Sequence, residues 1–446
     1  MKRAMRCHNF GCNAHVLHYV AGSQCGPIFR TFPRAVKNSI HATYNRFANV
    51  RAPVSTCRAG ARHERKPCPR QIHDMKKNFL GIKPREFLKR CWQKDLLLVR
   101  GALAPRAQLF ERDALFSLAG RDDVQSRLVV RARNRWKVSD GPFSRRALLA
   151  LPARNWTILV QGVNHVLPDA AELLQKFAFL PYARLDDVMV SYAAPGGGVG
   201  PHFDSYDVFL VQCRGRRRWR VSTQHDLRLV DGAPLKILRH FEPAAEFVLD
   251  PGDLLYLPPR YAHEGVALDE CVTCSIGFRA PSAQELATRF LEFLQERLAL
   301  PGVYEDRGLV PTRHPARIGH GMIDQVSRML DGIDWSRKDV IQFIGAYLTE
   351  PKPHIVLERP ARPLGIAAFV RTAQRGGIAL ALPALMLFHR HCVFINGEAL
   401  EASPTSAALL SRLADERELR LPAGTDRDTI ALLYGWYRAG YIRCRS

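Results

Sequence analysis

Residues 195–209 read PGGGVGPHFDSYDVF, and the interpretation of the whole chain starts from this stretch. Alternate side chains of an extended strand face the same side, so His202, Asp204 and Tyr206 share one face. An imidazole and a carboxylate two residues apart can supply two ligands to one metal ion. The glycine run is not a phosphate loop, because no helix with a Lys-Ser/Thr pair follows it. The stretch therefore predicts a turn that leads into a metal-binding strand.

A third ligand comes from residues 251–265, which read PGDLLYLPPRYAHEG and present His263 after a turn and a strand. Two histidines and one carboxylate are typical of non-haem Fe(II) oxygenases, which leave coordination positions open for other ligands. Zinc favours a closed or nearly closed tetrahedral set. Each motif alone is often accidental, but the two together indicate a metal site.

Residues 214–221 read RGRRRWRV, which a count of charges alone would assign to nucleic-acid binding. The period of two puts Arg217 on the same face as Trp219 and Val221, so one arginine is carried inward among apolar groups. A buried guanidinium needs a partner, and a carboxylate is the natural one. That partner is either the distal carboxylate of a dicarboxylic cosubstrate or a carboxylate of the protein.

From about residue 76 to its end, the chain resembles the bacterial JmjC-type ribosomal oxygenases. The resemblance is carried by GGGVGPHFDSYDVF, GRRRWRV, PGDLLYLPPRYAHEG and SIGFRAP. It implies a mainly β catalytic domain, a double-stranded β-helix of the JmjC/cupin type, followed by a helical dimerisation segment and a C-terminal winged-helix domain. It also implies 2-oxoglutarate-dependent hydroxylation of an arginine β-carbon in a large-subunit ribosomal protein.

The resemblance gives the candidate residues their expected roles. His202, Asp204 and His263 match the ligands of Fe(II), and Arg217 matches the residue that holds 2-oxoglutarate, with dioxygen as the second cosubstrate. Hydroxyl contacts with 2-oxoglutarate are expected from Ser191 and Ser275.

Substrate contacts are expected at the mouth of the pocket. Tyr206 faces the metal side and is expected to line the pocket. Carboxylates should receive the substrate guanidinium, and Asp207 and Glu264 are the candidates because each lies beside a metal ligand. The alternative for both is a role in a hairpin or at the surface.

The pattern of the chain divides it into four parts. Residues 76–281 are dominated by short β-patterned runs, as in a sandwich or barrel. Residues 282–350 have helical spacing, with Ser282 and Ser336 as expected caps. Residues 351–446 mix helices with a hairpin at Asn396-Gly397, which suggests a winged helix.

Residues 1–75 are read as a basic extension that is disordered or not part of the natural protein. Residues 1–74 hold thirteen Lys or Arg against two acidic residues, or +11 of the net +23. A targeting peptide and a nucleic-acid-binding arm are the alternatives, and Met75 would make a natural start. Five of the eleven cysteines lie here without paired spacing, so no zinc module is expected.

The remaining cysteines and histidines are expected to be structural. Cys271 and Cys274 lie three apart on a strand and so face opposite sides, which puts Cys274 in the core with its neighbours of the same face. The cluster at 388–392 (FHRHC) has no nearby carboxylate or second cysteine. Scattered thiols are typical of a reduced, cytoplasmic protein.

No apolar run approaches the ~20 residues that a membrane span needs, so we expect a soluble protein. The expected partners are a basic ribosomal-protein substrate and a second copy of the chain in a homodimer, with nucleic-acid contact secondary. Two alternative functions stay open: the same chemistry on another basic protein, or a non-catalytic cupin module that binds RNA or the ribosome. Because a basic enzyme repels a basic substrate, we also predict an acidic cleft near His202.

Overall fold

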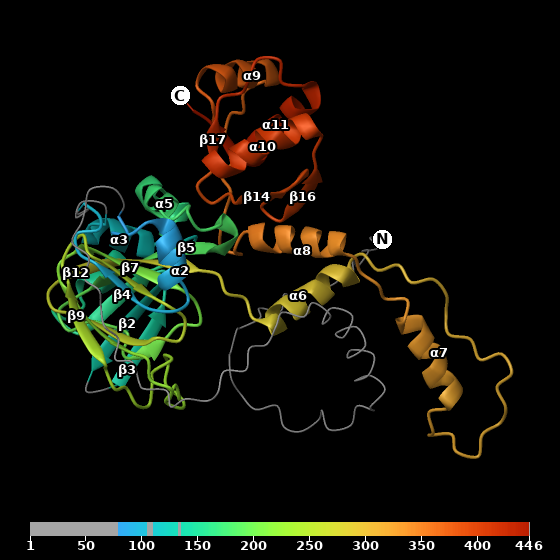
Figure 1. Ribbon diagram of the computed structural model, residues 1–446, viewed down its shortest axis with the longest axis horizontal. Coiled ribbons are helices and arrows are strands. Elements are labelled where there is room, and N and C mark those ends of the chain that lie inside the picture. Colours follow the sequence, from blue (N-terminus) through green and yellow to red (C-terminus); the bar gives the residue numbers. More distant parts are fainter. Residues whose placement is uncertain (1–78, 105–109, 133–134, 446) are drawn as a thin grey trace, which may run out of the picture. The chain divides into compact units, whose positions relative to one another are not determined.

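A computed structural model describes residues 79–104, 110–132 and 135–445 of the chain (Figure 1). The predictions about the basic head, residues 1–75, lie outside the described residues.

The β region forms two sheets. The larger has eight strands in the order β1-β10-β7-β12-β5-β4-β2-β3, and the smaller has four in the order β6-β11-β8-β9. The strands are β1 (Leu97–Val99), β2 (Ser126–Ala132), β3 (Arg135–Asp140), β4 (Trp156–Val160), β5 (Leu185–Ala193), β6 (His202–Phe203), β7 (Val208–Arg214), β8 (Arg217–Ser222), β9 (Ala245–Leu249), β10 (Leu254–Leu257), β11 (Ala262–Ala267) and β12 (Cys271–Phe278).

From β5 to β12 the chain passes back and forth between the sheets, with the consecutive strands β8 and β9 both in the smaller one. Strands β5, β7, β10 and β12 are neighbours in the larger sheet, while β6, β8, β9 and β11 make up the smaller one. Every pairing among them is antiparallel. This winding of eight strands into two facing sheets is a double-stranded β-helix, and the prediction of that fold is confirmed.

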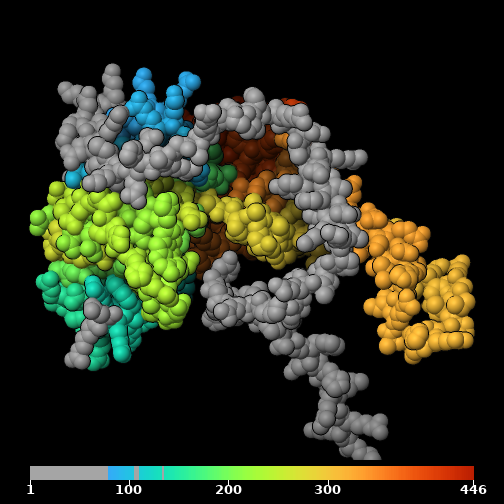
Figure 2. All heavy atoms as spheres, turned by 60° about the horizontal axis from the view of Figure 1, so that its bottom comes forward, coloured from blue at the N-terminus to red at the C-terminus, as the bar shows by residue number. Residues whose placement is uncertain are grey.

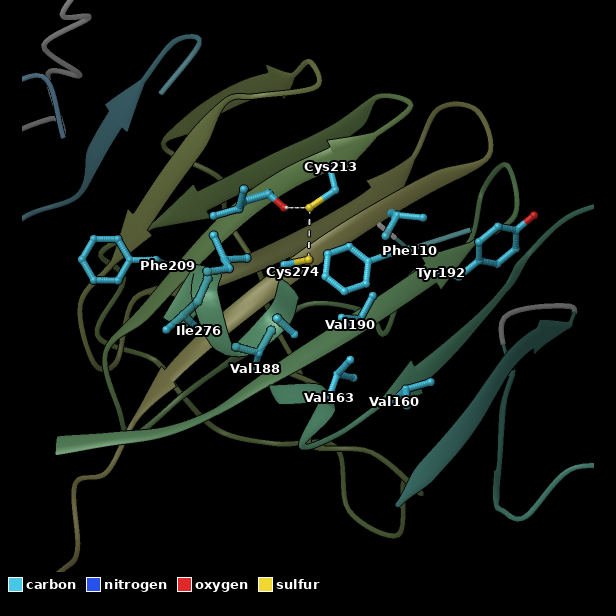
Figure 3. Packing of buried hydrophobic residues seen from close by; sticks show 14 of the residues in the cluster. Phe110, Val160, Val163, Val188, Val190, Tyr192, Phe209, Cys213, Cys274 and Ile276 are labelled. Carbon is cyan, nitrogen blue, oxygen red and sulfur yellow. Dashed lines mark hydrogen bonds between the residues drawn. The ribbon is translucent and has the colours of Figure 1, made fainter. Parts of the chain in front are cut away.

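Each face of the larger sheet has its own apolar core. One face packs with Phe87, Leu115 and Leu173 from the surrounding helices. Figure 3 shows this packing around Val190, Phe209 and Ile276. The other face meets the smaller sheet through a second cluster, which contains Val208, Leu210, Trp219, Val221, Phe247 and Leu255. The site is built beside this second cluster, between the sheets.

The predicted core position of Cys274 is confirmed, since it is buried with Val272 and Ile276. Its sulfur lies 3.0 Å from that of Cys213. Figure 3 marks this contact with a dashed line.

Several short helices interrupt the β region, where the sequence indicates mainly strands. They are α2 (Pro84–Arg90), α3 (Arg112–Ala119), α4 (Arg145–Leu149) and α5 (Pro168–Gln175). A helix of eight residues makes about two turns, too few for a 3.6-residue period to stand out from the sequence.

Three helices follow the barrel: α6 (Ala283–Gln295), α7 (His320–Leu330) and α8 (Arg337–Thr349). Both expected caps are present, since Ser282 accepts a hydrogen bond from the Glu285 amide and Ser336 forms a capping box with Asp339. Helices α6 and α8 pack through Phe290 and Phe343, whose ring centroids are 5.2 Å apart.

Helix α7, orange in Figure 2, buries none of its side chains. Its exposed apolar residues Met322, Val326 and Leu330 are spaced four apart and form one stripe, which Ile323 widens.

The C-terminal part combines helices with two small sheets of three strands. Its elements are α9 (Ile366–Arg375), β13 (Ile378–Leu380), β14 (Met386–His389), β15 (Cys392–Ile395), β16 (Glu398–Glu401), α10 (Pro404–Glu416), β17 (Glu418–Leu419), α11 (Arg427–Ala439) and β18 (Ile442–Cys444). The expected Asn396-Gly397 turn joins β15 to β16, with both residues at positive φ. The cluster at 388–392 forms the other turn of this hairpin sheet, as a structural segment.

None of the helices in the described ranges combines the length and the apolar character that crossing a membrane would need.

Candidate metal and cosubstrate site

The three expected metal ligands converge between the sheets. His202 in β6 lies directly opposite His263 in β11, and the ring centroids are 4.2 Å apart. Asp204 follows β6, and its Oδ2 lies 3.7 Å from the Nε2 of His263. One ligand atom from each residue can be chosen so that all three lie within 4.8 Å of one another. This is the one such cluster of three or more potential ligands among the described residues.

Hydrogen bonds hold both imidazoles in the orientation that a metal needs. The Nδ1 of His202 lies 2.9 Å from the carbonyl oxygen of Gly200, and that of His263 lies 2.9 Å from the carbonyl oxygen of Tyr261. A protonated Nδ1 that donates to a carbonyl leaves the lone pair of Nε2 free. Burial and the neighbouring His202 lower the pKa of His263 to about 4, so its ring is neutral at pH 7.

The donor set fits Fe(II). Two imidazoles and one carboxylate on the same side of an ion match the facial arrangement of non-haem iron sites and leave positions open for other ligands.

Arg217 lies inward on β8 with Trp219 and Val221, as the period of two predicts. Its Nη1 donates to the hydroxyls of Ser191 (2.9 Å) and Thr273 (3.1 Å). No carboxylate of the described residues forms an ion pair with it, and its Nε has no hydrogen-bond partner among them. Burial lowers the pKa of this guanidinium. A buried cation without a counter-charge is costly, so the position calls for an anion from outside the protein.

Trp219 connects the cation to the metal ligands. The Arg217 guanidinium lies 5.3 Å from the centroid of the Trp219 ring, and that ring lies 5.9 Å from the imidazole of His263. A short dianion could therefore extend along Trp219 with one end at the metal and the other at Arg217.

Thr273 and Gln212 are further residues of this pocket that the sequence did not reveal. The Thr273 hydroxyl donates to Oε1 of Gln212, so the lone pairs of the Thr273 oxygen are left to accept from Arg217. Thr273 pairs directly with Ser191 across β12 and β5. That register was not readable from the sequence. Ser275 lies two residues further along β12, on the same face as Thr273.

Asp207 serves the framework. Its side chain is fully buried, and it accepts hydrogen bonds from Tyr256 (2.6 Å) and Gln93 (3.0 Å) and, more weakly, from Arg184 (3.4 Å). Asp207 and Tyr206 are neighbours in an extended segment, so their side chains face opposite sides, and Asp207 points away from the side on which the metal ligands lie. The structure thus argues against the substrate-binding role predicted for Asp207, and its full burial also argues against the surface role that was the alternative.

Replacing Asp207 tests this assignment. We expect Asp207→Asn to lower the free energy of unfolding by about 1–3 kcal/mol, since charge-assisted hydrogen bonds in the interior are lost. Chemical denaturation measures the loss, with Asp269→Asn, an exposed partner of Arg216, as the control. Unchanged stability together with weakened substrate binding would restore the original prediction.

Glu264 likewise has a partner within the protein. It is buried next to His263 and is bonded to Arg220, which also lies against the ring of Phe241. Glu264 and His263 face opposite sides of β11 because they are adjacent in a strand. The predicted substrate role of Glu264 is therefore not supported by its position either.

Carboxylates do lie at the mouth of the pocket, on β5. Tyr206 is 39% exposed there, and a Cβ placed on Gly277 would lie 3.9 Å from its ring and 4.0 Å from Oδ1 of Asp187. Burial raises the pKa of the Tyr206 hydroxyl, and the nearby carboxylates of Asp204, Asp187 and Asp186 raise it further. Pocket lining by Tyr206 stays a prediction, and Asp187 is the nearby carboxylate that sequence reasoning missed.

Comparisons with known proteins agree with this geometry. A JmjC domain model matches residues 172–286, and a ROXA-like winged-helix model matches residues 331–443. The ribosomal protein uL16 3-hydroxylase of Escherichia coli is 33% identical over 362 residues, which are 80% of this chain and 96% of that protein. A probable ribosomal oxygenase of Haemophilus influenzae is 42% identical over 210 residues, which are 46% of this chain and 52% of that protein.

A solved structure is similar as well. That of the E. coli ribosomal oxygenase YcfD in complex with cobalt and 2-oxoglutarate has a TM-score of 0.70 and 32% identity, and the match covers 82% of this chain and 98% of that one.

Proposed function

Because the chain belongs to the JmjC-type ribosomal oxygenases and is a 2-oxoglutarate-dependent dioxygenase, we propose that it hydroxylates the β-carbon of an arginine in ribosomal protein uL16. We assign this activity to the cytoplasm, where ribosomal proteins are made. The observation that carries the proposal is the pairing of the His202, Asp204 and His263 cluster with a buried arginine that has no protein carboxylate.

In this proposal, His202, Asp204 and His263 hold Fe(II), and Arg217 receives the distal carboxylate of 2-oxoglutarate. When bound, the iron supplies the chemistry by which dioxygen decarboxylates 2-oxoglutarate to succinate and inserts an oxygen atom into a C–H bond. Ser191 and Thr273 orient the guanidinium of Arg217, and Trp219 forms an apolar wall that keeps water from the space between. Ser275 is a weaker candidate for a contact with 2-oxoglutarate.

The substrate arginine is proposed to enter beside Tyr206. The Tyr206 ring can pack on the alkyl part of the side chain, while Asp187 accepts from the guanidinium. The two hydrogen bonds that Asp187 accepts within the protein both go to Oδ2, which leaves Oδ1 for the substrate. Asp186 and Asp187 would make this mouth locally attractive to a cation in spite of the net charge of +23.

Mass spectrometry of uL16 tests the proposed function. The enzyme is loaded anaerobically with Fe(II), mixed with 2-oxoglutarate and uL16, and exposed to air. We expect one arginine peptide to gain the mass of one oxygen atom. Succinate without this gain would point to another basic substrate. If neither appears, the alternative of a non-catalytic binding module would take its place.

We further propose that the exposed stripe of α7, Met322, Ile323, Val326 and Leu330, packs against a second copy of the chain in a homodimer. A helix of eleven residues with an unburied apolar stripe gains little stability by itself. Burial of this stripe by an identical copy would remove it from water.

A charge in this stripe should break the dimer. We expect Val326→Glu to be monomeric in analytical ultracentrifugation at concentrations where the wild type is a dimer, because a carboxylate would be desolvated at the interface. Arg328→Glu places the same group on the opposite face of α7 and serves as the control. A wild-type monomer, or a Val326→Glu dimer, would contradict the proposal.

A further inference from the structure

A lysine from outside the barrel lies against the carboxylates at the mouth of the pocket. Lys352 belongs to the segment that follows α8. Its Nζ lies 3.1 Å from Oδ1 of Asp186 and 3.4 Å from Oδ2 of Asp187. The segment that leads into the winged-helix region thus contributes a cation to the entrance of the catalytic domain.

The contact leaves the two oxygens of Asp187 in different situations. Oδ2 accepts from the Gly162 amide at 3.1 Å and from Lys352. Oδ1 lies on the side of Gly277, close to the Tyr206 ring. The carboxylate is therefore held through Oδ2, while Oδ1 takes part in neither of these hydrogen bonds.

The charge of Lys352 also offsets the burial of Asp187, whose side chain is only 13% exposed. Burial raises the pKa of this carboxyl, and Lys352 is the largest influence that lowers it, while Asp186 raises it further. Arg279 faces Asp186, at 3.5 Å. His354 lies near enough to Lys352 and Asp187 for both to act on its pKa, which burial lowers.

We propose that Lys352 is a positioning residue for substrate binding: its contact with Oδ2 holds the Asp187 carboxylate turned so that Oδ1 can accept from the guanidinium of the substrate arginine. This inference rests on the proposed function.

The competing explanation is that these ion pairs only attach the segment after α8 to strand β5. Other contacts already hold the end of α8, because Arg279 donates to the carbonyl of Leu348 and Arg289 pairs with Glu350. Under that explanation, replacing Lys352 would lower the stability of the protein without a specific effect on the affinity for the substrate. The experiment therefore has to separate stability from substrate affinity.

A double-mutant cycle makes this separation. Binding of a fluorescent uL16 peptide is measured by anisotropy on the anaerobic enzyme with Fe(II) and 2-oxoglutarate, so that no turnover occurs. The variants are Lys352→Met, Asp187→Asn and their combination. Lys352→Arg keeps the charge, and Lys176→Met is a control at an exposed lysine.

We expect Lys352→Met to weaken the binding of the peptide about tenfold, because the charge that holds Asp187 in place is lost. Lys352→Arg keeps that charge and should bind the peptide about as tightly as the wild type does. In the Asp187→Asn background, Lys352→Met should have little further effect, because the group through which it acts is gone. The affinity for 2-oxoglutarate should not change in either background. Melting temperatures identify any variant that fails to fold, and Lys352→Gln, which also removes the charge, then replaces Lys352→Met in the comparison.

Three results would overturn the inference: an unchanged peptide affinity in Lys352→Met, an equal loss in both backgrounds, or a parallel loss of 2-oxoglutarate affinity. A wild-type enzyme that neither binds nor hydroxylates the peptide would instead refute the proposed function, and the inference with it. A wild type that hydroxylates while Lys352→Met is normal would refute the inference alone.

Discussion

Conversion of 2-oxoglutarate to succinate falls by more than about a thousandfold in His202→Ala, because the remaining imidazole and carboxylate cannot hold iron in a facial set. The Nδ1 of this imidazole is hydrogen-bonded to the carbonyl oxygen of Gly200, which fixes the orientation of the ring. No neighbouring side chain of the described residues can take over its place as a ligand. Succinate production and iron content, measured on the same sample, test the expectation.

His225→Ala is the matched control, since His225 is exposed on the loop that follows β8. It should bind iron and turn over like the wild type. A His202→Ala enzyme that loses iron but keeps its melting temperature confirms a local effect. Retention of turnover in His202→Ala would mean that the cluster is not the catalytic metal site.

Arg217→Met should weaken the binding of 2-oxoglutarate about a hundredfold or more, as expected for removal of one partner of a buried charge pair. The two possible partners of Arg217 predict opposite changes in stability. If the anion comes from the cosubstrate, the free enzyme buries an unpaired cation, and methionine should leave its melting temperature unchanged or raise it. If the partner is instead a carboxylate of the protein, Arg217→Met leaves that carboxylate buried without a counter-charge, and the melting temperature should fall.

Thermal denaturation with and without 2-oxoglutarate measures both effects, under anaerobic conditions and with iron present. The cosubstrate should stabilise the wild type and have much less effect on Arg217→Met. Arg218→Met changes the next residue, which lies on the opposite face of β8 beside Glu246, and should behave like the wild type. A destabilised Arg217→Met enzyme with normal affinity would refute the assignment.

The sequence predicted what depends on strand periodicity and short spacing. His202 and Asp204 share a face because they lie two residues apart, and the same period carries Arg217 inward beside Trp219. The period also explains why Asp207 and Glu264 are poor candidates: each lies an odd number of residues from a ligand and faces the other way. A residue that is close to a ligand along the chain does not necessarily face the same side of the strand.

The residues that were missed depend on contacts between distant parts of the chain. Thr273 reaches Arg217 because β12 pairs with β5 in one particular register. Asp187 reaches the mouth because Gly277, 90 positions later, leaves room beside Tyr206. Lys352 comes from a segment beyond three further helices, α6, α7 and α8. Local patterns in the sequence do not determine such register and docking.

The origin of the inserted oxygen tests the central claim most directly. The wild-type enzyme is supplied with Fe(II), 2-oxoglutarate, uL16 and dioxygen labelled with a heavy oxygen isotope, and both products are analysed by mass spectrometry. A working dioxygenase places one labelled atom in the arginine and one in succinate, with one succinate formed for each hydroxylated arginine. Unlabelled oxygen in the arginine, or hydroxylation that proceeds without succinate, would contradict the account.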